Sequence, residues 1–171
     1  MSQQQQPNNE GNGGSKLVLR RIAIRASFRA NSAPPGVADF ISSTPYEHKG
    51  LLRNTMSGMF DDQIPLHRPE WWIVQHDDDI KGLALVSYTR LNGEGLQEFV
   101  GVEHLLVAKD YRNKGVGSLI ILTLQKLARK RKDLGGVNLE SEVELLQYYS
   151  RFGFVKRAFQ SGAFVKLIWR S

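Results

Sequence analysis

The sequence predicts a mixed α/β protein with one central sheet of six or seven strands and about four flanking helices. Three observations support this fold class: runs of branched and aromatic residues bounded by turn residues, a long amphipathic stretch at 115–131, and the alternation of strand and helix patterns along the chain. The 171 residues, 41% of them hydrophobic, suffice for one core and hardly for two. We therefore expect a single folded domain over residues 16–171.

The N-terminal part of the chain is the hardest to interpret. Residues 1–15 contain no aliphatic residue after the first Met, and their Gln, Asn and Gly side chains cannot bury enough surface to offset chain entropy. We expect this segment to be a disordered tail. Branched residues at 17–25 predict the first strand. Helices are predicted at 37–41 and 51–60, and residues 61–69 then break the regular pattern.

A hairpin and a further strand follow. Residues 71–76 are predicted as one strand, Asp77-Asp78-Asp79 as the turn and residues 80–89 as the return strand. Asn92-Gly93-Glu94-Gly95 marks another turn, and residues 98–107 form the next strand. The aspartate run has no further ligand spacing around it, so the turn is a better interpretation than a metal site.

The C-terminal half alternates helices and strands. Val116, Ile120, Leu124 and Leu127 recur at helical spacing and predict a long helix over 115–131. The remaining predicted elements are a helix end at 133–136, a short strand at 137–140, a helix at 142–152 closed by Gly153, and two strands at 154–156 and 163–169.

The composition limits the partners and the compartment. A net charge of +6 at pH 7 and a pI of about 9.7 favour anionic partners, although a basic surface can also serve solubility alone. The absence of cysteine excludes disulfides, thiolate metal sites and a cysteine nucleophile. No apolar run approaches the roughly 18 residues that span a bilayer, and no apolar leader is visible. We expect a soluble intracellular protein, cytoplasmic or nuclear, without membrane contact.

The segment Arg112-Asn113-Lys114-Gly115-Val116-Gly117 joins a strand to the long helix. The start of a helix leaves several backbone N–H groups without partners, and together with the positive end of the helix dipole these groups attract anions. Gly115 and Gly117 allow the backbone to approach phosphate oxygens without a Cβ in the way. The segment therefore predicts a site for a phosphate-bearing ligand between strand and helix.

The chain carries two motifs in a defined order. Arg112-Asn113-Lys114-Gly115-Val116-Gly117 fits the pattern Gln/Arg-x-x-Gly-x-Gly/Ala at every defined position. Tyr148-Tyr149-Ser150-Arg151-Phe152-Gly153-Phe154 fits an aromatic-Tyr-x-x-x-Gly-Phe pattern, with one helix and one short strand between the two motifs. In this combination the chain resembles the GNAT acyltransferase superfamily and its fold. The resemblance covers about residues 16–171 and is strongest between residues 71 and 154.

The resemblance implies acetyl-CoA, or another acyl-CoA, as acyl donor. It implies an N-acetyltransferase that acts on a primary amine of a small molecule, a protein lysine or a protein N-terminus. The amine would attack the thioester directly, with assistance from a general base and a general acid. The backbone N–H of Leu105 would contact the thioester carbonyl. The implied cofactor contacts are Leu105, Leu106 and Val107 along the pantetheine, and Arg112, Asn113, Lys114, Gly115, Val116, Gly117 and Ser118 around the pyrophosphate.

Tyr149 occupies the position at which the family often has its general acid. A phenol can donate a proton to a leaving thiolate. The adjacent Tyr148 makes the assignment ambiguous, and both rings could instead pack beneath the helix.

Two carboxylates are candidates for the general base. Glu103 lies two residues before Leu105, so we expect both side chains on the same side of the strand and His104 on the opposite face. Glu140, at the end of the next strand, is the alternative base, and a solvated glutamate would explain Glu103 equally well. Glu142 departs from the family pattern, because many relatives have Asn near this point.

The sequence leaves the acceptor and the assembly open. Arg129-Lys130-Arg131-Lys132 ends the long helix, where cations complement the helix C-terminus, and nucleic-acid contact is the less favoured interpretation. The alternative to an enzyme is a non-catalytic basic or acyl-CoA-binding module that contacts nucleic acid or an acidic protein. Either a monomer or a homodimer is compatible with the sequence.

Overall fold

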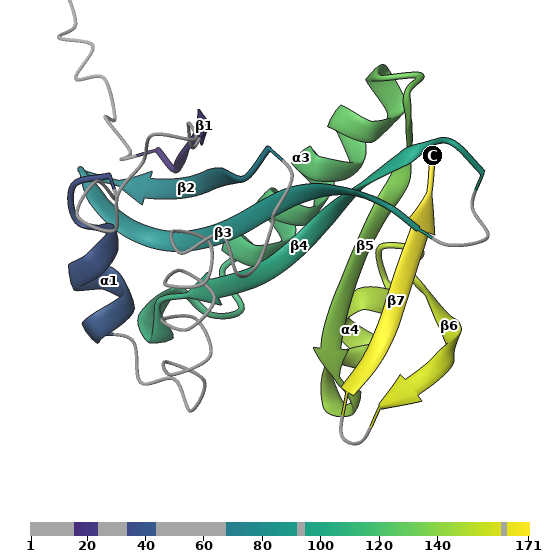
Figure 1. The fold of residues 1–171 in the computed structure, drawn as a ribbon. Coiled ribbons are helices and arrows are strands. Elements are labelled where there is room, and N and C mark those ends of the chain that lie inside the picture. Colours follow the sequence, from purple (N-terminus) through teal and green to yellow (C-terminus); the bar gives the residue numbers. More distant parts are fainter. Residues whose placement is uncertain (1–15, 24–33, 44–67, 92–94, 162–163) are drawn as a thin grey trace, which may run out of the picture.

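A computed structural model describes residues 16–23, 34–43, 68–91, 95–161 and 164–171 (Figure 1). The tail predicted at 1–15, the helix predicted at 51–60 and most of the irregular stretch at 61–69 lie outside these residues. Within the described ranges, no helix is long and apolar enough to cross a lipid bilayer.

Seven strands form one mixed sheet, which confirms the predicted fold class. The strands are β1 (Val18–Ala23), β2 (Glu70–His76), β3 (Asp79–Arg90), β4 (Glu98–Val107), β5 (Leu134–Glu142), β6 (Val155–Ser161) and β7 (Phe164–Arg170). Their order in the sheet is β1-β2-β3-β4-β5-β7-β6. All neighbouring strands are antiparallel except β4 and β5, which are parallel and therefore need a crossover helix between them.

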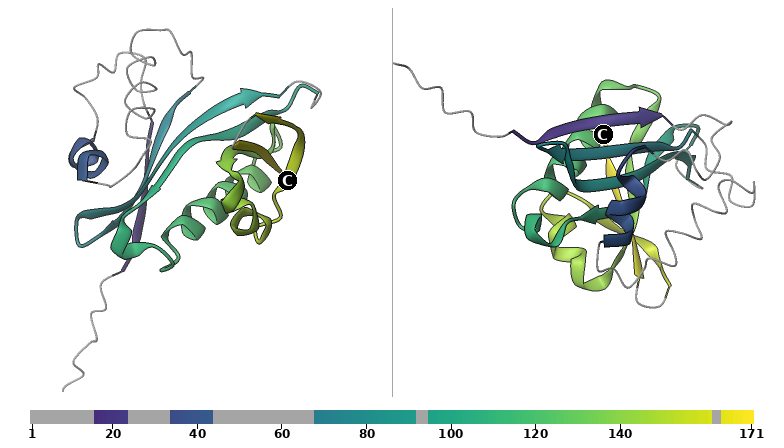
Figure 2. Two further views of the ribbon diagram at one scale, coloured as in Figure 1. Left: turned by 90° about the horizontal axis from the view of Figure 1, so that it is seen from below. Right: turned by 90° about the vertical axis from the view of Figure 1, so that its left-hand side faces the viewer.

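Helices cover both faces of the sheet. They are α1 (Val37–Ser43), α3 (Val116–Lys130) and α4 (Leu146–Ser150), with the 3₁₀ turns η2 (Lys109–Tyr111) before α3 and η3 (Val143–Leu145) before α4. Figure 2 shows α1 on one face, and α3 and α4 on the other. Alternating side chains of β2 serve the two faces, because Trp71 packs in the cluster with α1 and Trp72 in the cluster with α3.

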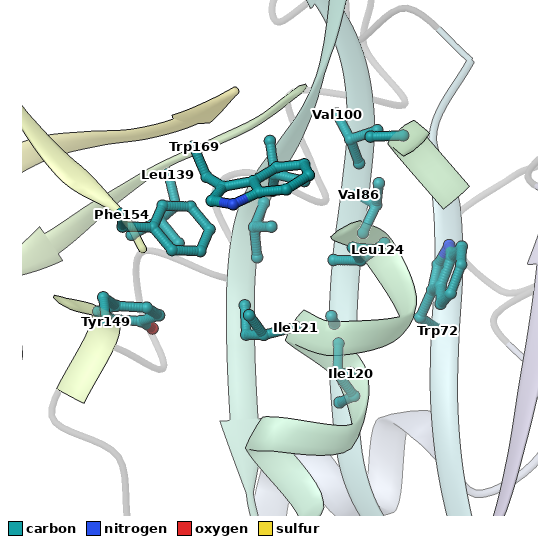
Figure 3. Packing of buried hydrophobic residues seen from close by; sticks show 14 of the residues in the cluster. Trp72, Val86, Val100, Ile120, Ile121, Leu124, Leu139, Tyr149, Phe154 and Trp169 are labelled. Atoms are coloured by element: carbon teal, nitrogen blue, oxygen red, sulfur yellow. The ribbon is translucent and has the colours of Figure 1, made fainter. Parts of the chain in front are cut away.

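The larger part of the core lies between the sheet and α3 (Figure 3). Ile120, Ile121 and Leu124 of α3 are fully buried against the strands. Full burial of such a side chain contributes about 1.5–3 kcal/mol, so this apolar stripe holds α3 firmly on the sheet. Gln125, also buried, donates from Nε2 to the Phe152 carbonyl oxygen at 2.7 Å and so links α3 to the chain just after α4.

The start of β5 differs from the prediction. Residues 133–136 are predicted as a helix end, but Leu134 already begins the strand. The glycines at this point serve close packing within the sheet instead of a loop. A Cβ on Gly135 would lie 2.7 Å from the Phe99 ring, and one on Gly136 would lie 1.9 Å from the Trp169 carbonyl oxygen.

The helix predicted at 142–152 is too long. Glu142 is the last residue of β5, and the helical residues that follow are divided between η3 and the short α4. Gly153 has φ +78°, the left-handed conformation that glycine adopts where a helix closes.

β4 and β5 run side by side only over their first halves. Their pairing ends at Val102 and Leu139, whereas β4 continues to Val107 and β5 to Glu142. The two strands diverge from this point (Figure 1), so in the described part of the chain β4 has no partner strand on that edge after Val102. The other edge of β4 pairs with β3, with a β-bulge at Glu103.

Candidate functional site

A cleft of about 760 Å³ opens on the α3 side of the sheet, beside the divergence of β4 and β5. Its walls come from the end of β4, the loop and first turn of α3, the end of β5, and η3 with α4 and Arg151 after it. The lining residues are Leu105, Val107, Tyr111, Arg112, Asn113, Gly115, Val116, Gly117, Ser118, Glu142, Leu145, Tyr148, Tyr149 and Arg151. The predicted cofactor residues all line this cleft except Leu106 and Lys114.

The loop before α3 presents bare backbone to the cleft. Gly115 is the N-cap residue with φ +84°, and Asn113 also has a positive φ of 61°. No side chain caps the helix, and nothing lies within 4 Å of the place where a Cβ on Gly115 would be. The helix start at Gly115 therefore has open space beside it, and the first helical turn lines the cleft, as an anion site requires.

Tyr148 and Tyr149 form part of the opposite wall. A Cβ on Gly117 would lie 2.8 Å from Tyr148 Oη, so this tyrosine reaches across to the first turn of α3. The Tyr149 ring is 6% exposed and meets the Tyr148 and Phe154 rings edge to face, with centroids 5.0 and 5.9 Å apart. Tyr149 is therefore a core residue, near Phe154 in Figure 3, and it also lines the cleft.

Tyr111 closes the cleft next to the loop. Its Oη lies 2.9 Å from His76 Nδ1, which ties η2 to the β2–β3 hairpin. The ammonium groups of Lys81 and Lys114 each lie 5.0 Å from the centre of the Tyr111 ring. These cation–π contacts occupy Lys114, which explains why its side chain is not part of the cleft lining.

The end of β4 supplies the floor of the cleft. Leu105 and Val107 line it and pack on the α3 side. The Leu106 side chain, 3% exposed, packs on the α1 side. A contact of Leu106 with a ligand is therefore open only to its backbone, and that contact stays a prediction.

Glu103 lies on the opposite side of the sheet from Leu105, so the prediction that they share a side is wrong. The Ser87 hydroxyl donates to Glu103 Oε1, and Ser87 faces away from α3 because its neighbours in β3 pack in the α3-side cluster. His104 pairs with Leu85, a residue of the α1-side cluster. The bulge thus places Glu103 and His104 on one side together, which simple alternation along a strand does not foresee.

The other carboxylates near the divergence differ in exposure. Glu140 is exposed and faces away from α3, because Leu139 before it packs on the α3 side. Glu142 is half-buried and lines the cleft itself. Glu103 and Glu140 are the residues directly after the last β4–β5 pair, one on each strand.

Five lining residues were not among the predicted contacts. Two of them were considered in the sequence, Tyr148 as the neighbour of Tyr149 and Glu142 as a departure from the family pattern. The other three are Tyr111, Arg151 and Leu145. Tyr111 directly precedes the first motif, and Arg151 lies within the second. Their closeness to the motifs could have identified both as candidates for the cleft lining. Leu145 carries no such signal, because it reaches the cleft through η3, which the sequence pattern merges with α4.

Comparison with known proteins decides the family. Residues 67–156, more than half of the chain, match the family described as the acetyltransferase (GNAT) domain. The protein belongs to the GNAT family. No curated protein matches the sequence significantly.

Solved structures share the GNAT fold with this chain at low sequence identity. Arabidopsis thaliana NAA60 in complex with acetyl-CoA has a TM-score of 0.61 and 14% identity, covering 91% of this chain and all (100%) of the other. A Trypanosoma brucei acetyltransferase has a TM-score of 0.56 and 19% identity, covering 85% and 97%. A bacterial toxin has a TM-score of 0.61 and 15% identity, covering 91% of each chain.

Proposed function

We propose that this GNAT protein transfers an acetyl group from acetyl-CoA to a primary amine. The observation that carries the proposal is one continuous cleft that joins the open loop at Gly115 to the unpaired edge of β4. The structure of Arabidopsis thaliana NAA60 was determined with acetyl-CoA, which supports this choice of donor for a chain of the same fold. When bound, acetyl-CoA supplies the activated thioester.

The residues of the cleft fit the parts of acetyl-CoA. The N–H groups at the start of α3 would hold the pyrophosphate, with added charge from the exposed cations Arg112 and Arg151. The pantetheine amides would pair with the free edge of β4, as an added strand would. Leu105 and Val107 provide apolar contacts along that edge.

The two proton transfers would involve groups on opposite faces of the sheet. Glu103 or Glu140, on the face away from α3, would accept the proton that the acceptor ammonium must lose before it can attack. Tyr149, on the cleft side, would donate a proton to the leaving thiolate of CoA. The backbone N–H of Leu105 would orient the carbonyl of the thioester.

Calorimetric titration of acetyl-CoA into the full chain tests the donor. We expect binding that Arg112→Ala weakens about tenfold, since a charge-assisted hydrogen bond contributes on the order of 1.5–3 kcal/mol. Lys126→Ala, which removes an exposed cation of α3 outside the cleft lining, is the matched control. No binding of acetyl-CoA or CoA by the wild-type protein would exclude the proposal.

Thiol release with a panel of amines and peptides, followed by mass spectrometry of the products, tests the reaction. Removal of a general base lowers turnover by about 10²–10⁴-fold, so comparison of Glu103→Gln with Glu140→Gln identifies the base. Equal, unaffected turnover in both variants would exclude both carboxylates.

A second candidate function is an acyl-CoA-binding protein without transferase activity. The position of Glu103 favours it, because this carboxylate lies on the opposite side of β4 from the cleft residue Leu105. Tight acetyl-CoA binding together with no acetylated product across the panel would favour this function over the first.

A further inference from the structure

The turn η2, which leads from β4 into the loop before α3, rests against the end of the β2–β3 hairpin. The Tyr111 hydroxyl and His76 Nδ1 lie 2.9 Å apart, within hydrogen-bond distance, and the two rings are tilted with their centroids 5.6 Å apart. The backbone N–H of Ala108 donates to the Lys81 carbonyl oxygen at 3.0 Å. The hairpin therefore holds both ends of η2, one through the backbone and the other through a side chain.

Tyr111 transmits this support to the loop before α3. Lys114 contacts Tyr111 twice, because its backbone N–H donates to the Tyr111 carbonyl oxygen at 3.3 Å and its ammonium group lies 5.0 Å from the centre of the ring. Gly115, the N-cap residue of α3, follows directly in the chain. A continuous series of contacts thus runs from His76 through Tyr111 and Lys114 to the start of the helix.

His76 lies one hydrogen bond behind the wall of the cleft. It is the last residue of β2, and its side chain is 26% exposed. Asp77 Oδ2 lies 3.6 Å from the same Nδ1, beyond hydrogen-bond distance, so Tyr111 is the nearer partner. Tyr111 lines the cleft, whereas no residue of β2 or β3 does so. His76 is therefore placed to affect a ligand in the cleft through Tyr111.

We propose that His76 is a positioning residue for acetyl-CoA: by fixing Tyr111, it holds the loop at 112–117 in the conformation that receives the pyrophosphate. The proposal rests on the acetyl-CoA binding of the proposed function and extends the site to the β2–β3 hairpin. A loop that is already held in place loses less freedom on binding, so the affinity for the ligand is higher. The effect is confined to the phosphate end of the ligand, because Leu105 and Val107 at the pantetheine end are placed by β4 itself.

Calorimetry with two probes tests this role in the full chain. CoA carries the phosphates and the pantetheine, whereas 3′-phospho-ADP carries the phosphates alone. We expect His76→Ala to raise the Kd of both probes by the same factor, about three- to tenfold, as the loss of one hydrogen bond between neutral groups does. A damaged cleft would weaken CoA more than 3′-phospho-ADP, because the pantetheine contacts would be lost as well, and this result would overturn the proposal.

Two further variants test whether His76 acts through the Tyr111 hydroxyl. In His76→Asn the side-chain amide takes about the place of Nδ1 and can bond to that hydroxyl, so both Kd values should return to within about twofold of wild type. Tyr111→Phe keeps the ring and removes the hydroxyl, so it should match His76→Ala. The double variant His76→Ala/Tyr111→Phe should be no weaker than either single variant, and additive losses would overturn the proposal.

Gln75→Ala is the matched control. Gln75 precedes His76 in β2, and its Nε2 donates to the Asp78 carbonyl oxygen at 3.1 Å within the same hairpin. The variant therefore removes a hydrogen bond of the hairpin that does not involve Tyr111. We expect wild-type Kd values for CoA and 3′-phospho-ADP. Equal weakening in Gln75→Ala and His76→Ala would show a general loosening of the hairpin and would count against a positioning role of His76.

Steady-state kinetics separate this proposal from the transferase. With ethylamine as the acceptor, His76→Ala should raise the KM for acetyl-CoA and leave kcat and the KM for ethylamine close to wild type. Weaker CoA binding in His76→Ala, with no acetylated product from the wild-type protein across the panel of amines, would leave the positioning role in place and exclude the transferase. Turnover by the wild-type protein, with wild-type Kd values in His76→Ala, would exclude the positioning role and leave the transferase in place.

Discussion

The hydroxyl of Tyr148 and the backbone of Gly117 share one small volume at the start of α3. The Tyr148 ring is held there by edge-to-face contacts with Tyr149 and Phe152, at centroid distances of 5.0 and 5.2 Å. A side chain at position 117 would meet Oη at 2.8 Å, closer than real Cβ atoms approach. The second glycine of the first motif is thus coupled to the first aromatic residue of the second motif.

Gly117→Ala should weaken acetyl-CoA binding about tenfold, because overpacking of this order, about 1–3 kcal/mol, displaces Tyr148 into the cleft. The double variant Gly117→Ala/Tyr148→Phe should recover most of the affinity, because the hydroxyl that meets the new methyl is absent. Calorimetry on the single and double variants measures this coupling. Equal weakening in both variants would mean that the methyl itself blocks the phosphates.

Tyr149→Phe should lower kcat by about 10²-fold or more, because it removes the proposed proton donor to the leaving thiolate. The ring remains to fill its place in the core, so acetyl-CoA affinity and thermal stability should stay close to wild type. Steady-state kinetics and calorimetry make this comparison, with Tyr148→Phe as the control. Similar kcat values in the two variants would assign the general acid to another group.

Single residues were predictable where their backbone conformation is unusual and their spacing is fixed. Gly115 and Gly117 are of this kind, since one needs a positive φ and the other leaves no room for a Cβ. The side on which Glu103 lies was not predictable, because a β-bulge depends on how β3 and β4 pair and leaves no periodic pattern.

β1, β2 and β3 are joined by an ionic network around the buried Glu70. Arg21 Nε donates to Glu70 Oε2 at 2.6 Å, and Trp72 Nε1 donates to the same oxygen at 3.0 Å. Tyr88 Oη lies 3.3 Å from both carboxylate oxygens. Burial by itself would raise the pKa of Glu70, but the hydrogen bonds from Arg21 and Trp72 and the charge of Arg21 outweigh it, so the pKa is lowered.

This lowered pKa makes part of the folding stability dependent on pH. In the unfolded chain the pKa of Glu70 is about 4.5, and above it the contribution of Glu70 to the free energy of unfolding is fully present. This contribution is lost as the pH falls through the lower pKa that Glu70 has in the folded protein. Urea unfolding between about pH 3 and pH 7 should show a smaller loss on acidification in Glu70→Gln than in wild type. At neutral pH the variant should be less stable, by about 1–3 kcal/mol. Parallel pH profiles of wild type and variant would contradict this assignment.

Whole elements were predictable to different degrees. The strand predicted at 98–107 has the same bounds as β4, because branched residues run between two clear turn signals. The β2–β3 hairpin is confirmed, and Asp77 and Asp78 have the positive φ values that its tight turn requires. The start of β5 was mispredicted, because Gly135 and Gly136 are typical of loops and are here selected by contacts with Phe99 and β7, which are distant in sequence.

The molecule as a whole separates two electrostatic environments by one layer of sheet. The cleft side carries Arg112 and Arg151 around an open helix start, whereas the opposite side carries Glu103 and Glu140 at the divergence of β4 and β5. A net charge of +6 gave no hint of this separation. Lys166 is the cross-strand partner of Glu140, and Glu142 lines the cleft, so the contrast rests mainly on the two arginines and Glu103. The two sides meet at the divergence, where β4 and β5 stop pairing.

That divergence also has a mechanical consequence. In the described residues, β1 to β4 are joined to β5, β7 and β6 by five residue pairs between β4 and β5. These pairs run from Glu98–Leu134 to Val102–Leu139. A ligand lying along the open edge of β4 would take the place of a neighbouring strand. The backbone groups on this edge after Val102 would then form hydrogen bonds only while the ligand is bound. Binding and folding are then linked, and at a hundredfold excess over Kd the loaded protein gains about 2.7 kcal/mol.

Hydrogen exchange measures this linkage directly. Those amides of residues 103–107 that point to the open edge of β4 should exchange quickly in the free protein and slow down with acetyl-CoA, whereas those that face β3 are already protected. The protection should extend into β5 across the gap. Protection confined to the loop before α3 would mean that the ligand contacts the edge without bridging the two halves. Protection that does extend into β5 would mean that the free protein is two half-sheets joined by five residue pairs, and that the bound ligand joins them a second time.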